Sequence, residues 1–97
     1  MIVGIVSIQI HIPEARSLKD KRRVVQALVA RMHERYRVSV AETDHHDAHQ
    51  RAEIGVAAVG KSEGEVSRLL ARLRDEIESR GDALVTRFEP QILEDMA

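Results

Sequence analysis

The spacing of hydrophobic residues alternates between a period of two and a period near 3.6, and this alternation most restricts what the chain can fold into. From residue 2 to residue 12 the period is two, as in a β-strand with one buried face. Pro13 cannot donate a hydrogen bond to a neighbouring strand, so it ends this segment. The buried side of the predicted strand carries Ile2, Val6, Ile8, Ile10 and Ile12.

Two helices are expected, each with a serine placed to cap its N-terminus. Ser17 precedes a helix predicted over about residues 18–35, and Asp20 takes the third position of its capping box. Ser62 and Glu65 form a second capping box, and Gly81 suits the residue that follows the last turn. The two apolar faces carry Leu18, Val25, Leu28, Val29, Met32 and Tyr36 in the first helix, and Val66, Leu69, Leu70, Leu73 and Ile77 in the second.

Period-two segments also predict strands over residues 38–41, 52–58 and 84–88, the first two joined as a hairpin. The resulting order is βαββαβ. Because each helix has one apolar face, both should cover the same side of the sheet. Right-handed strand–helix–strand connections then predict an α+β, ferredoxin-like sandwich. We expect one domain over residues 1–97, with a four-stranded antiparallel sheet and two helices on one face.

Two segments resemble the YlxP-like family of small bacterial proteins. The first is Leu18-Lys19-Asp20-Lys21-Arg22-Arg23-Val24-Val25, preceded by residues 11–13 and 15–17. The second runs from Val38-Ser39-Val40-Ala41-Glu42 through Asp44-His45 and Asp47 to Gln50-Arg51-Ala52. The likeness covers nearly the whole chain and implies the same ferredoxin-like fold, but it implies no activity.

The charges are unevenly distributed. Residues 14–37 hold eight Lys or Arg against three acids, a net charge of +5, while the whole chain has a net charge of −1. Cations near a helix N-terminus oppose the helix dipole, so their number there suggests a use such as binding phosphate. Ordinary solvated surface charge remains the other interpretation. The candidate anion-binding residues are Arg16, Lys19, Lys21, Arg22 and Arg23.

These cations lead us to expect a non-catalytic accessory protein that binds RNA or a ribonucleoprotein, such as a ribosomal particle. Aromatic residues are 2% of the chain, namely Tyr36 and Phe88, so base stacking on the sheet is not expected. Binding should instead be directed to the phosphate backbone and be sensitive to salt. The alternative is an interaction module that has no role with nucleic acid.

That alternative rests on the sheet face away from the helices. The residues expected there are small or apolar and carry no charge, which suggests a homodimer. The competing interpretation is that scattered small residues simply face water. The face is expected to carry Val3, Ile5, Ser7, Ala41, Gly55, Ala57 and Val59.

A third possibility is a metal site in the predicted hairpin loop, which contains His45, His46 and His49 together with Asp44 and Asp47. Imidazole and carboxylate ligands suit Zn²⁺, Ni²⁺ or Mn²⁺. However, adjacent residues on a turn point in different directions, and Asp and His are ordinary loop residues. His45 also belongs to the stretch that resembles the family, so it is the preferred functional residue of the three.

No catalytic motif is present: the chain lacks a P-loop and has no cysteine. We therefore expect neither an enzyme nor a cofactor. The absence of cysteine is consistent with a reducing cytoplasm, and the first apolar stretch is too short to span a membrane. The expected location is the cytoplasm, without membrane contact.

Overall fold

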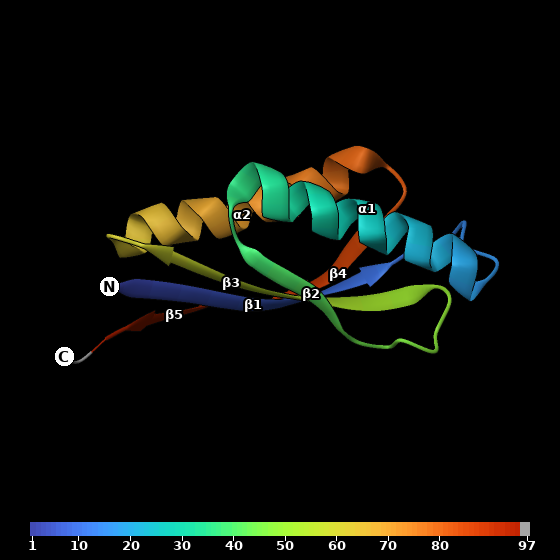
Figure 1. The fold of residues 1–97 in the computed structure, drawn as a ribbon, viewed down its shortest axis with the longest axis horizontal. Coiled ribbons are helices and arrows are strands. Elements are labelled where there is room, and N and C mark those ends of the chain that lie inside the picture. Colours follow the sequence, from blue (N-terminus) through green and yellow to red (C-terminus); the bar gives the residue numbers. More distant parts are fainter. Residues whose placement is uncertain (96–97) are drawn as a thin grey trace.

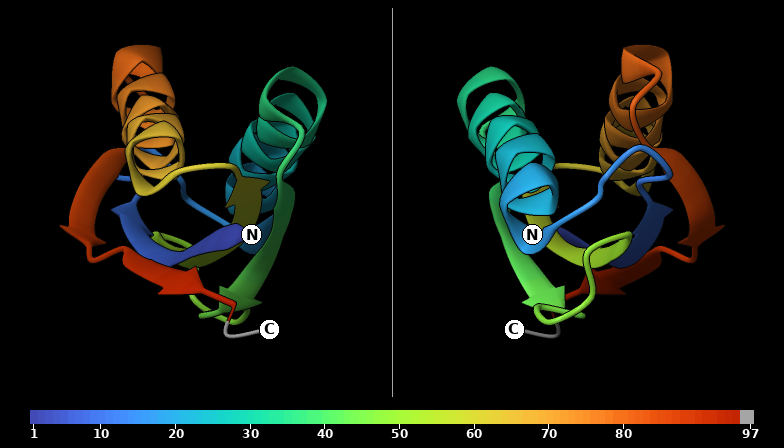
Figure 2. Two further views of the ribbon diagram at one scale, coloured as in Figure 1. Left: turned by 90° about the vertical axis from the view of Figure 1, so that its left-hand side faces the viewer. Right: turned by 90° about the vertical axis from the view of Figure 1, so that its right-hand side faces the viewer.

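The structure, a computed structural model, describes residues 1–95 and consists of one sheet covered by two helices (Figure 1). The helices are α1 (Leu18–Tyr36) and α2 (Glu63–Arg80). Both lie on the same side of the sheet, as the end-on views in Figure 2 show. The strands are β1 (Ile2–His11), β2 (Ser39–Asp44), β3 (Arg51–Gly60), β4 (Leu84–Phe88) and β5 (Gln91–Glu94).

The sheet has the order β2-β3-β1-β4, and β5 also pairs with β1. All of these pairings are antiparallel. The α+β, ferredoxin-like βαββαβ arrangement predicted from the sequence is thereby confirmed. In this topology each helix crosses over between strands that do not pair with each other directly.

The sheet has five strands, so the prediction of four was wrong. β4 pairs only with residues 8–11 of β1, and the edge of residues 2–5 is left for another strand. Beyond Pro90 the chain continues along that edge as β5. Ile92 of β5 pairs with Gly4 and packs against the core, which gives this short strand an apolar anchor.

The helix ends form as the sequence indicated. The hydroxyl of Ser17 accepts a hydrogen bond from the Asp20 amide at 3.1 Å, and that of Ser62 accepts one from Glu65 at 3.2 Å. Gly81 ends α2 with φ of 82°, a left-handed conformation that glycine adopts without strain. Arg37 ends α1 in a similar conformation, with φ of 53°.

The core lies between the sheet and the two helices. It contains the inward-facing residues of β1 and β3 and the apolar faces of α1 and α2. A close approach occurs at Gly4, where an added β-carbon would overlap Val66 Cγ1 of α2. The predicted first strand ends one residue early, and Ile12 is buried with its amide bonded to the Gln50 carbonyl at 2.8 Å.

Candidate nucleic-acid interface

Three of the predicted cations form one exposed surface at the start of α1. Lys19, Arg22 and Arg23 are all exposed. Arg22, Arg23 and Gln26 follow Lys19 by three, four and seven residues, so the four side chains lie on one side of the helix. Ala27 lies next to these four residues on the same face of the helix. We call Lys19, Arg22 and Arg23 the basic ridge.

The basic ridge is not neutralised within the part of the chain that is described. Among residues 1–95, no ion pair includes Lys19, Arg22 or Arg23. Further along α1 the situation differs, because Arg31 and Arg35 both pair with Glu76 of α2. Within α1, the cations that no ion pair neutralises therefore lie in the first turns.

Arg16 is also exposed and lies just before the helix. Its backbone amide donates to the Asp20 carboxylate at 2.9 Å, while the Asp20 amide donates to Ser17. The capping side chains thus occupy two backbone amides at the start of the helix. What this end of the helix offers to an anion is chiefly its cationic side chains.

Lys21 does not belong to the exposed cluster, and its prediction as an anion-binding residue was wrong. Its side chain is only 1% exposed and pairs with Glu42, 17% exposed, at 2.8 Å. Its ammonium group also donates to the carbonyls of His45 at 2.8 Å and His46 at 3.3 Å. With three acceptors, Lys21 has no donor left for an external phosphate.

The ion pair between Lys21 and Glu42 could have been predicted from the positions of the two residues on their helix and strand, although not from a count of charges. Lys21 stands four residues before Val25 and seven before Leu28, so it lies on the buried side of α1. Glu42 stands two residues after Val40 and shares its side of β2. A charge at an inward position of each element indicates a buried ion pair, and this one joins α1 to the β2–β3 hairpin.

The three loop histidines do not converge on a metal site. His45 extends toward β1, where its Nε2 lies 3.1 Å from Gln9 Oε1, whereas His46 and His49 are exposed. Among residues 1–95, no group of three or more His, Asp or Glu side chains is arranged to hold a metal ion. Adjacent loop residues point apart, which is the geometric reason why the spacing was misleading.

His45 instead has a structural part in the hairpin. Its φ of 64° is unusual for a residue with a β-carbon. Its amide donates to its neighbour Asp44 at 2.7 Å, and its carbonyl accepts from both Lys21 and Ala48. These bonds hold the turn in its left-handed conformation. Lys21 of α1 therefore helps to fix the β2–β3 loop through its hydrogen bonds to the loop carbonyls.

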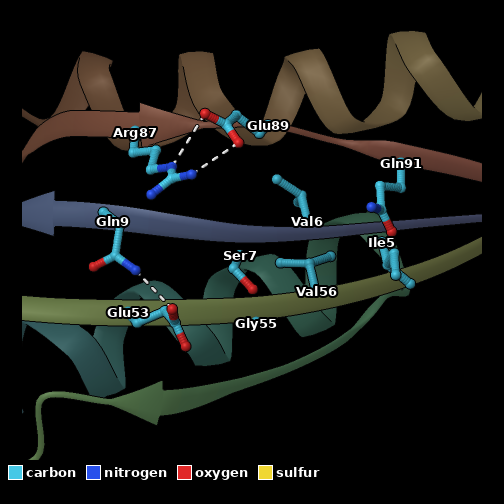
Figure 3. A pocket seen from close by; sticks show the side chains of 10 residues that line it. All are labelled: Ile5, Val6, Ser7, Gln9, Glu53, Gly55, Val56, Arg87, Glu89 and Gln91. Atoms are coloured by element: carbon cyan, nitrogen blue, oxygen red, sulfur yellow. Dashed lines mark hydrogen bonds and ion pairs between the residues drawn. The ribbon is translucent and has the colours of Figure 1, made fainter.

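A second concave region lies on the sheet face away from the helices (Figure 3). Its cavity has a volume of about 370 Å³, with Ser7 and Gly55 at the centre. Gln9 donates to Glu53 at 2.6 Å on one side, and Arg87 donates to Glu89 at 3.1 Å on the other. The hydrogen bond and charge of Arg87 lower the pKa of Glu89 below its ordinary value. We did not predict these polar residues as part of a site.

Comparison with known proteins identifies a family. Residues 3–90 match the sequence profile of a family described as "Protein of unknown function (DUF503)". "Uncharacterized protein YlxP" of Bacillus subtilis (strain 168) is 35% identical over 74 residues, covering 72% of this chain and 80% of that protein. The NMR structure of LFR1 1, a de novo designed protein with a ferredoxin fold, gives a TM-score of 0.49 at 12% identity. That match covers 100% of this chain and 89% of the designed chain.

Proposed function

Starting from the fact that the chain belongs to the DUF503 family, and that it is similar to YlxP, we propose that it binds the phosphate backbone of structured RNA through the basic ridge. The observation that carries this proposal is the position of Lys19, Arg22 and Arg23. They are exposed on one side of a helix N-terminal region, and no ion pair in residues 1–95 includes them. Arg16 extends the same cationic surface.

Phosphate is the chemistry that this arrangement fits. Arg and Lys donate several hydrogen bonds to phosphate oxygens, and a convex helix can approach the grooves of a duplex. The ridge contains no aromatic side chain on which a base could stack, so recognition of sequence is not expected. The protein would act as an accessory factor on folded RNA, free or within a ribonucleoprotein, in the cytoplasm.

The described residues give no reason to place the protein in a bilayer. Neither helix within residues 1–95 combines the length and apolar character needed to cross one.

Salt dependence tests the proposal. We expect the association constant for a labelled, structured ribosomal RNA fragment to fall with salt, with a log–log slope of about −2 to −3 for three phosphate contacts. Lys19→Gln should reduce the magnitude of this slope by about 1, because one contact is lost. Fluorescence anisotropy over a salt series measures both quantities.

No binding at low salt, or a slope unchanged in Lys19→Gln, would contradict the proposal. If no RNA binding is seen at low salt, we would expect the basic ridge to bind an acidic protein surface instead.

A further inference from the structure

The sheet face opposite the helices, here called the open face, is apolar at one end. Val3 pairs with Val59 of β3 on one side and with Leu93 of β5 on the other. Val59 is 65% exposed and Leu93 51%. Ile5, in the next row, is 36% exposed and lies beside Ala57. These side chains form one continuous exposed apolar surface, which the helices do not cover.

The other end of the open face is polar and carries both signs of charge. Gln9 pairs with Glu53 on one side and with Arg87 on the other. Glu53 also accepts from Thr43 of β2 at 2.6 Å. Between the two ends, Ser7 and Gly55 lie side by side in the concave region, and the Thr43 side chain of β2 fills the position that a β-carbon of Gly55 would take.

This pattern is complementary to itself under one particular symmetry. We infer that the open face binds the open face of a second copy, related by a two-fold axis that runs along the strands between β1 and β3. This rotation exchanges β1 with the partner's β3, and β4 with the partner's β2. The apolar end of one copy then meets the apolar end of the other.

The strand register gives the opposing residues under this rotation. Val3 lies opposite the partner's Val59, and Ile5 opposite the partner's Ala57. Ser7 meets the partner's Gly55, so small residues lie opposite each other at the centre of the two faces. Stacked sheets cross at about 30°, which keeps the residues near the axis opposite one another.

Charge supports the same arrangement. Arg87 comes over the partner's β2 at Asp44, one strand away from the partner's Glu53. Glu89 accepts from two nitrogens of the Arg87 guanidinium, which leaves further N–H groups for a second acceptor. A two-fold axis across the strands would instead place Val3 and Val59 against the charged end near Arg51. The along-strand axis is therefore the one that polarity favours, and it also brings Arg87 toward the acidic residues of the partner.

The size of the face is also sufficient. β1 and β3 have 10 residues each, or about 33 Å of strand. Four adjacent strands span about 19 Å, so the flat footprint is about 600 Å² per copy. Stable interfaces commonly bury roughly 800 Å² of accessible surface per partner, and accessible area exceeds a flat footprint. The helices remain on the outside of such a dimer, so this inference is independent of the basic ridge.

The test is the mass of the full chain in solution. By sedimentation velocity or light scattering, we expect about twice the 10.9 kDa of one chain. Ile5→Glu should raise the dimer dissociation constant at least about 100-fold, because it puts an unpaired charge in the apolar part of the interface. Circular dichroism checks that the variant is folded. Val59→Glu provides a second disruption at an exposed position.

Ala71→Glu is the matched control, since it adds the same charge at an exposed position of α2. It should leave the dimer intact. A wild-type monomer at high concentration, or assembly beyond a dimer, would overturn the inference. So would a dimer that survives both Ile5→Glu and Val59→Glu.

Discussion

Replacing Lys21 with methionine should lower the free energy of unfolding by about 3 kcal/mol, the largest effect on stability that we expect from the loss of one charge. Methionine preserves most of the buried volume, but the Glu42 carboxylate loses its cation. The carbonyls of His45 and His46 lose their donor as well. The expected value lies at the lower end of the range for buried pairs because Glu42 keeps 17% exposure. Urea unfolding followed by circular dichroism gives the measurement.

Two further variants separate the ion pair from the bulk of the side chain. Lys19→Met, two residues earlier on the exposed side of α1, should change stability by less than about 0.5 kcal/mol. Lys21→Met combined with Glu42→Leu removes both charges and should recover more than half of the loss, because no buried charge is left unpaired. If Lys21→Met unfolds at the same urea concentration as the wild type, the buried pair does not stabilise the fold.

Reversing two charges of the basic ridge should have the largest effect on binding. We expect Lys19→Glu combined with Arg23→Glu to weaken RNA binding at least about 100-fold at low salt, since two attractions to phosphate become repulsions. Both side chains are exposed, so the fold should be retained. Fluorescence anisotropy with the same structured ribosomal RNA fragment measures the change.

Helix α2 offers a closely matched control. Arg68 and Arg72 are also four residues apart and exposed, and no ion pair within residues 1–95 includes them. Arg68→Glu with Arg72→Glu changes the net charge by the same amount but leaves the ridge intact. When both double variants are compared at the same moderate salt concentration, where charges beyond a Debye length are screened, it should alter affinity by less than about threefold. Equal losses in the two double variants would show that net charge, and not the ridge, governs binding.

The fold was largely predictable because local and global patterns agree. The capping serines Ser17 and Ser62 and the apolar sides of both helices all lead to the same topology. β5 was missed because it is four residues long and follows Pro90. A segment that short shows no hydrophobic periodicity of its own. It forms a strand because β4 leaves the backbone groups of residues 2–5 of β1 free to pair with it.

The candidate sites were less predictable, since their residues come from separate elements. A count of charges placed Lys21 with its neighbours, although its position four residues before Val25 puts it on the other side of the helix. The spacing of His45 and His46 suggested ligands, but a left-handed turn at His45 directs them apart. The contact between Gln9 and Glu53 depends on the register of β1 with β3, which local sequence does not specify.

The most direct test of the basic ridge is to map RNA contacts residue by residue. We would titrate ¹⁵N-labelled protein with a structured ribosomal RNA fragment at low salt and follow the backbone amide resonances. We predict that shifts concentrate on residues 16–27, at the start of α1, while those of α2 stay close to their free positions. Shifts confined to α2 or the open face, or no shifts at all, would contradict binding through the ridge.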